Sequence, residues 1–133
     1  MPVVWNNSMS TGVPEVDRQH QDLIGQLNRL NEAMSQGKGR DEIAKMLDFL
    51  ADYVVRHFAA EERHMDVLGC PAAAANRQAH REFLGTFKAL RERFDAAGAQ
   101  PTLVLEIHGT LSKWLVGHIT KIDTQLSACA VHA

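Results

Sequence analysis

Residues 43–65 read IAKMLDFLADYVVRHFAAEERHM, and one face of this stretch repeats at every third or fourth position. That spacing is typical of an amphipathic helix with one side facing a core. The face consists of Ile43, Leu47, Leu50, Val54, His57, Glu61 and Met65. Two of its members are polar, and burying a polar side chain costs free energy unless a partner binds it. The stretch therefore predicts both a bundle helix and a binding site inside the bundle.

The remainder of the chain carries the same spacing in three further segments. We predict helices at about 16–36, 41–68, 71–97 and 101–127, separated by short turns that contain glycine or proline. Helices of this length with short connections are typical of an antiparallel up-down-up-down bundle. Residues 1–15 are expected to form an irregular N-terminal arm that packs Trp5 and Val13 against the helices. The predicted fold is all-α, one four-helix bundle domain over residues 1–133.

Composition narrows the classes of function. Of 133 residues, 45% are hydrophobic and 23% charged, with a net charge of −2, so no basic surface for nucleic acid is indicated. No stretch approaches the roughly 20 apolar residues of a membrane span, and the first residues do not read as a signal peptide. We therefore expect a cytoplasmic protein without membrane insertion. Cys70 and Cys129 are expected to be reduced thiols, and the lack of a further apolar stripe favours a monomer.

Each predicted helix places potential metal ligands on its buried face. They are His20 in the first helix, His57 and Glu61 in the second, Asn76 and His80 in the third, and His118 and Asp123 in the fourth. Residues four apart lie on one helix face, so the ligands are expected to converge at one level of the bundle. A spacing of five rotates Asp123 by about 140° from His118 in an ideal helix. We therefore predict an irregular helix between Ile119 and Ile122.

Imidazoles and carboxylates without cysteine suit iron, manganese, zinc or copper. Two carboxylates together with several imidazoles favour a pair of metals over a single ion. The alternative is a set of hydrogen-bonded core residues, which is the commoner explanation for a lone buried histidine. Several such residues in one register favour the metal site. The remaining histidines serve as a comparison: His108 and His132 are expected to be solvated, and His64 to lie two turns beyond the site.

The motifs resemble those of the hemerythrin family, and more closely its single-domain bacterial members. The resemblance is carried by Gly12-Val13-Pro14-Glu15-Val16-Asp17-Arg18-Gln19-His20, by His57-Phe58-Ala59-Ala60-Glu61 and by Trp114-Leu115-Val116-Gly117-His118-Ile119-Thr120-Lys121-Ile122-Asp123. It implies two non-haem irons with an oxo, hydroxo or water bridge that bind dioxygen reversibly. Glu61 and Asp123 would bridge the irons. His20 and His57 would hold the oxygen-accepting iron, and His80 and His118 the other.

One position departs from the family pattern. Asn76 stands where a third histidine of the second iron is expected, and an amide oxygen is a poor replacement for imidazole. We expect an open or water-filled position there. The implied function is oxygen storage, delivery or sensing without enzymatic turnover, with dioxygen and an oxygen-consuming enzyme as partners. The alternatives are a peroxidase-like or oxidase-like enzyme, and a bundle with partial or single-metal occupancy. The expected oxygen pocket is lined by Leu23, Phe58, Leu115 and Ile119, for which core packing is the alternative role.

Overall fold

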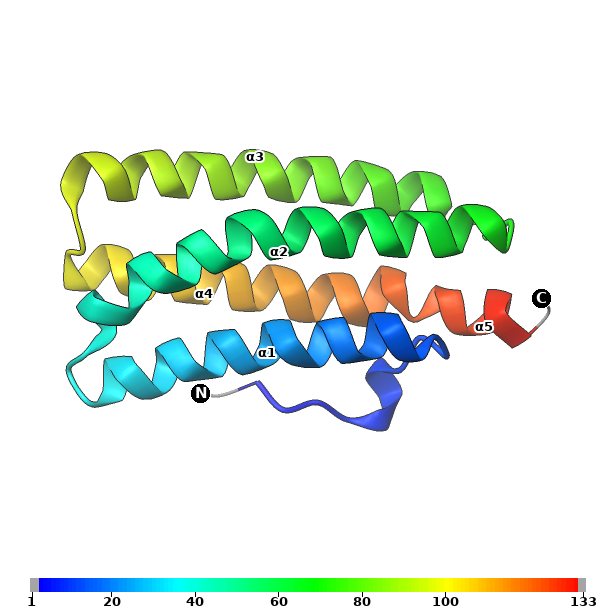
Figure 1. The fold of residues 1–133 in the computed structure, drawn as a ribbon, viewed down its shortest axis with the longest axis horizontal. Coiled ribbons are helices and arrows are strands. Elements are labelled where there is room, and N and C mark those ends of the chain that lie inside the picture. The colour runs from blue at the N-terminus through cyan, green and yellow to red at the C-terminus, as the bar shows by residue number, and fades with distance from the viewer. Residues whose placement is uncertain (1–2, 132–133) are drawn as a thin grey trace.

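The computed structural model describes residues 3–131, and in these residues every regular element is a helix. The long helices are α1 (Pro14–Ser35), α2 (Gly39–Val67), α3 (Ala73–Ala97) and α4 (Pro101–His118). They lie side by side and alternate in direction (Figure 1). Shorter elements are η1 (Asn7–Met9), η2 (Ile119–Asp123) and α5 (Gln125–Val131). The prediction of an all-α antiparallel four-helix bundle is confirmed.

The turns end the helices as their residue types require. Gly37 and Gly69 adopt positive φ angles of 74° and 62°, a conformation that glycine reaches at little cost, directly after α1 and α2. Pro14 starts α1, because a first-turn residue needs no N–H donor. The fourth helix was predicted over 101–127 with an irregular turn between Ile119 and Ile122. It is interrupted by η2, whose residues form a π-helix, before α5 continues the chain.

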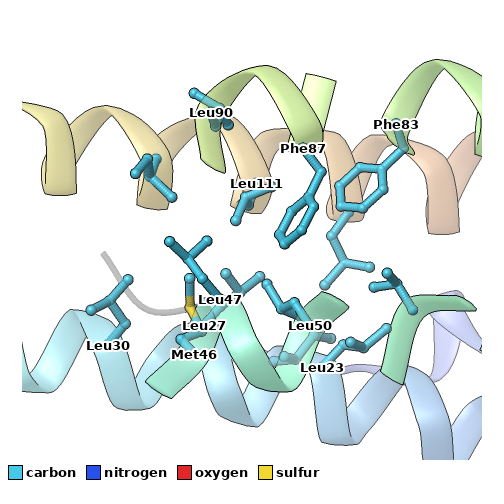
Figure 2. Packing of buried hydrophobic residues seen from close by; sticks show 14 of the residues in the cluster. Leu23, Leu27, Leu30, Met46, Leu47, Leu50, Phe83, Phe87, Leu90 and Leu111 are labelled. Atoms are coloured by element: carbon cyan, nitrogen blue, oxygen red, sulfur yellow. The ribbon is translucent and has the colours of Figure 1, made fainter. Parts of the chain in front are cut away.

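Two apolar clusters lie along the bundle with a polar layer between them. The main core fills most of its length, and in Figure 2 Phe83 and Phe87 of α3 point toward Leu23 and Leu50 of the facing helices. A smaller cluster closes the opposite end and consists of Val16, Met65, Cys70, Ala72 and Leu126. The predicted metal ligands lie between the two clusters in every helix. The layer is therefore shielded from water at both ends.

The N-terminal arm is tied to α1 near the polar layer. The amide of Asn28 accepts from the backbone N–H of Val3 at 2.8 Å and donates to its carbonyl at 2.7 Å. The carboxylate of Asp17 accepts from the hydroxyl of Ser10 at 2.7 Å and from that of Thr11 at 2.7 Å. Asp17 lies about one turn before His20 and Asn28 about two turns after it, so the bonds hold the arm along α1 on both sides of this ligand. Trp5 packs against the main core, as predicted.

The cysteines form a disulfide, which corrects the sequence-based expectation of two thiols. Cys70 in the turn between α2 and α3 is bonded to Cys129 in α5, with Cα atoms 5.5 Å apart. Neither cysteine has a nearby partner in sequence, and only the return of α5 to the end of the bundle brings them together. The expectation of reduced thiols followed from the expected cytoplasmic location, and the disulfide contradicts the reduced state. No helix among residues 3–131 is long and apolar enough to cross a membrane.

Reduction of this disulfide should destabilise the protein markedly. The bond closes a loop between cysteines 59 residues apart, and cross-linking a loop of that length contributes roughly 4 kcal/mol in the chain-entropy treatment. Urea unfolding with and without dithiothreitol measures the difference. Cys129→Ser is the control, because its stability should not respond to reductant. Equal stability of the oxidised and reduced wild-type chain would contradict the prediction.

Candidate metal centre

Six of the seven predicted ligands meet in the polar layer as two overlapping groups. One contains His20, His57, Glu61 and Asp123, and the other contains Glu61, His80, His118 and Asp123. In each group the ligand atoms lie within 4.8 Å of one another, and all of these side chains are buried. Both carboxylates belong to both groups. That arrangement suits two cations that share their acidic ligands.

Each carboxylate turns one oxygen toward each group. Glu61 Oε2 lies 3.1 Å from His20 Nε2, whereas Glu61 Oε1 lies 3.0 Å from His80 Nε2. Asp123 Oδ2 lies 3.0 Å from His20 Nε2, whereas Asp123 Oδ1 lies 2.9 Å from His118 Nε2. Both side chains thus present their oxygens as a bridge between two sets of imidazoles.

The π-helix η2 is what brings Asp123 into the layer. Thr124 N–H donates to the carbonyl of Ile119 at 3.1 Å, a bond five residues back instead of four. The wider turn absorbs the angle that would otherwise separate Asp123 from His118. Thr120 satisfies the carbonyl of Val116 with its hydroxyl at 2.8 Å. The predicted irregular helix is confirmed, and such π-turns are frequent at functional sites.

The donor set fits metal ions better than it fits hydrogen bonds. The nitrogens His80 Nε2 and His118 Nε2 face each other at 3.1 Å, and both also face carboxylate oxygens. Both oxygens of Asp123 are buried, and although imidazoles lie nearby, neither oxygen has a hydrogen bond of acceptable geometry. Buried polar atoms of proteins are rarely left in this state. One cation within each group would give all of these nitrogen and oxygen atoms a partner.

Asn76 occupies the edge of the second group. It is fully buried, and its Oδ1 lies 3.0 Å from His118 Nε2. Its Nδ2 is also buried and has no hydrogen-bond partner. The structure therefore brings the amide to the centre, with an unsatisfied donor group.

Comparison with known proteins shows to which family the chain belongs. The sequence pattern described as the hemerythrin HHE cation binding domain matches residues 11–130. The chain belongs to the hemerythrin family.

Hemerythrins of several sources resemble it along most of their length. The chain is 34% identical to the bacteriohemerythrin of Pseudomonas aeruginosa over 121 residues, 91% of this chain and 76% of that protein. It is 34% identical to the bacteriohemerythrin of Methylococcus capsulatus over 119 residues, 90% of this chain and 88% of that protein. The crystal structure of a wild-type hemerythrin superposes with a TM-score of 0.81 at 32% identity and covers 98% of each chain.

Two residues that contact the candidate ligands were missed by the sequence analysis. Gln19 Oε1 lies 2.7 Å from His57 Nδ1, and Glu62 Oε2 lies 2.9 Å from His80 Nδ1. An acceptor at Nδ1 keeps the proton on that nitrogen and leaves Nε2 free to bind a metal. The available signal was their position directly beside His20 and Glu61. The side chain of Glu62 points away from that of Glu61 on α2, and it reaches His80 on the neighbouring helix α3.

Aromatic side chains fix two of the imidazole rings. Phe58 stacks on His80 with ring centres 3.7 Å apart, and Trp114 stacks on His118 at 4.4 Å. The rings are nearly parallel in both pairs, with interplanar angles of 6° and 13°. Both histidines are thereby held with Nε2 toward the carboxylates.

Charges in the layer shift the pKa values strongly in the absence of metal. Burial alone would lower the pKa of His20 and of His118, but Asp123 and Glu61 outweigh it and raise each pKa to about 9. For His57 burial prevails and lowers the pKa to about 3. Burial and the charge of Glu61 raise the pKa of Asp123. Burial also acts to raise the pKa of Glu61, but the surrounding histidines lower it well below its usual range. Protons on His20 and His118 therefore balance the carboxylates when no metal does.

The other histidines among residues 3–131, His64 and His108, lie outside the two groups. His64 Nε2 is 3.7 Å from the carboxylate of Glu15. The expectation that His108 is solvated is wrong, because its ring is buried between helices and its Nε2–H donates to the carbonyl of Leu27 at 3.1 Å. Burial lowers its pKa, in keeping with a neutral structural histidine. His132 lies outside the described residues.

An apolar cavity of about 20 Å³ lies in the main core. Of the four residues expected to form an oxygen pocket, Leu23, Phe58 and Leu115 line it and Ile119 does not. Ile119 is fully buried in the core instead. The cavity volume exceeds the 10–15 Å³ or so that one water-sized molecule requires.

The metal-free protein should lose stability as the pH rises from 6.5 to 9. In this window the folded chain keeps protons on His20 and His118 that the unfolded chain releases, so the contribution is complete below pH 6.5 and disappears near pH 9. Each histidine accounts for at most about 3 kcal/mol. Urea unfolding of chelator-treated protein at pH 6.5, 7.5 and 9 measures the loss. His118→Gln should retain only the share due to His20. Stability that is constant or rising over this range would refute the assignment.

Removing the acceptor behind His80 should weaken metal binding without unfolding the bundle. Glu62→Ala deprives His80 Nδ1 of its partner, and loss of such a partner typically costs 10–100-fold in affinity. Glu62→Gln retains an acceptor oxygen and should lose less. Competition with a chelator for ferrous iron gives the affinities. Glu92→Ala, at an exposed position of α3, the helix that carries His80, is the control. The idea fails if Glu62→Ala binds metal as tightly as the wild type does.

Proposed function

We propose that this chain binds dioxygen reversibly at a centre of two non-haem irons in the bundle core. The observation that carries the proposal is the pair of shared carboxylates, since Glu61 and Asp123 each face two separate sets of histidines. His20 and His57 would hold one iron, and His80 and His118 the other. A single ion would not need ligands on both sides of both carboxylates. Membership of the hemerythrin family supports the choice of iron and of oxygen.

Two irons held this way would supply the electrons that reversible oxygen binding requires. The chain's own contribution is to fix the ligands and to keep water away. Gln19 and Glu62 hold imidazoles in one tautomer, and Phe58 and Trp114 hold rings in one plane. The apolar cavity offers a space for dioxygen without a polar group that would retain water. These features favour storage, delivery or sensing of oxygen over turnover.

Asn76 should make the second iron different from that of a centre with a third histidine. A neutral amide oxygen binds iron more weakly than imidazole does. The iron of His80 and His118 should therefore be lost more readily and should keep a position for water. We expect the six strong ligands, which are four imidazoles and two shared carboxylates, to hold both metals in the folded bundle.

A peroxidase-like or oxidase-like activity is the second candidate, and Asn76 is the observation that favours it. An open position next to a buried amide donor would admit peroxide to the second iron. Occupancy by one metal is the remaining alternative. In that case the chain would be a bundle with a partly filled site.

Exchange of Asn76 for histidine separates these candidates. The wild type should hold two irons per chain, bind oxygen after anaerobic reduction and return to its deoxygenated spectrum when oxygen is removed. Asn76→His should bind the second iron at least 10-fold more tightly, because it regains an imidazole ligand, and should oxidise more slowly in air. Elemental analysis and absorption spectra through repeated oxygen cycles provide the data.

Each alternative has its own outcome in this experiment. Irreversible oxidation with turnover of peroxide and a reductant would favour the enzyme, and one iron per chain would favour the partly filled site. Identical iron affinity and oxygen cycles in both proteins would refute the role given to position 76.

A further inference from the structure

A surface groove runs between α3 and α4 and borders His118, one of the candidate metal ligands. It has a volume of about 460 Å³ and is lined by Ala79, Thr110, Lys113, Trp114, Gly117, His118, Lys121 and Ile122. His118 is the one candidate ligand that lines it, and its Nε2 faces Asp123 and Asn76. The groove therefore approaches the second ligand group from the surface, and Trp114 separates it from the apolar cavity, which the same residue lines.

The groove carries positive charge. Lys113 and Lys121 both line it and are exposed, and no acidic side chain among residues 3–131 lines it with them. Within the same residues neither lysine forms an ion pair with a carboxylate. Two unneutralised cations at the mouth of a cleft raise the local concentration of anions.

Small residues bring the groove close to the centre. Ala79 lies one position before His80, and Gly117 one position before His118. A Cβ atom added at Gly117 would meet no atom within 4 Å, so the glycine borders open space. Gly117 and Ala79 thus leave little protein between the groove and the imidazoles.

Next to His118, Asn76 provides a buried hydrogen-bond donor. Its amide reaches His118 with Oδ1, while its Nδ2 is buried without a partner. A buried donor in this state is costly, and an anion bound beside it would accept its hydrogen bond. Each of the two metal groups also has the same strong donors, two imidazoles and two shared carboxylates. Neither metal would then be saturated by protein ligands.

We propose that the groove delivers a small monovalent inorganic anion to the metal held by His80 and His118, where Asn76 Nδ2 donates a hydrogen bond to it. This inference rests on the proposed di-iron function. It assigns the second metal an external ligand of its own, so the centre takes two such ligands instead of one. Charge on the metals offsets the negative charge of the carboxylates and permits the anion to bind.

Azide is a suitable probe, and its stoichiometry on the ferric protein tests the proposal. Calorimetry and absorption titration should give two azides per chain for the wild type with two irons, and one for Asn76→His. Two irons with a single azide in the wild type, or two azides in both proteins, would overturn the inference.

The route is tested by blocking the groove. Gly117→Leu places a side chain in open space, so it should leave the fold intact and slow the second azide phase at least 10-fold. Gly109→Leu is the matched control, since this glycine of α4 also borders open space and does not line the groove. Lys113→Gln with Lys121→Gln should slow the same phase and weaken its dependence on salt. An unchanged second phase in Gly117→Leu and in the lysine variant would overturn the route.

Failure of this inference can be told apart from failure of the proposed function. Iron content and the oxygen cycle are measured on the same preparations. Two azides without reversible oxygen binding would refute the oxygen function alone. Two irons, reversible oxygen binding and one azide would refute the anion site alone. One iron per chain would refute both.

Discussion

Burial of two carboxylates among four imidazoles is the constraint on which the arrangement of this protein depends. Glu61 and Asp123 are fully inaccessible to water, and placing ionised groups in a protein interior costs several kcal/mol unless opposite charges accompany them. Each long helix places a histidine beside these carboxylates, and without metal two of the four histidines would carry protons. Each helix is therefore tied to the others at one level through the same two acidic side chains. A helix that rotated by one residue would lose its place in this network.

The irregular parts of the fold are concentrated where they serve that layer. The π-helix η2 gives up regular hydrogen bonding to bring Asp123 beside His118. Beyond it, α5 buries Leu126 in the small apolar cluster and is fastened by the disulfide to the turn that precedes α3. On the opposite side the arm is bonded to Asp17, one turn from His20. The end of the bundle that holds the ligands is thus reinforced covalently and by hydrogen bonds, while the far end relies on apolar packing.

Features that depend on the periodicity of one helix were predictable from sequence, and features that depend on contacts between helices were not. The spacing of His57 and Glu61 predicts their common face, and the spacing of His118 and Asp123 predicts a distorted turn. By contrast, helix periodicity shows only that Glu62 points away from the ligand face of α2. Its contact with His80 depends on where α3 packs, which the sequence does not reveal. His108 is polar on a segment that periodicity places off the ligand face. Its burial depends on how closely α1 approaches, which no local pattern specifies.

Asn76 is the position at which local pattern and three-dimensional setting give different information. By sequence it is a lost histidine, and its expected effect is a weaker ligand. In the structure it is also a buried hydrogen-bond donor beside a ring whose outer edge borders a cationic groove. A histidine there would offer the metal a further imidazole, whereas in the proposed site the amide leaves that metal position to an external ligand and donates a hydrogen bond to it. The two sides of the proposed centre are therefore unlike in their surroundings although their strong donors are equal in kind and number. One side meets the apolar core, and the other is reached from a charged surface.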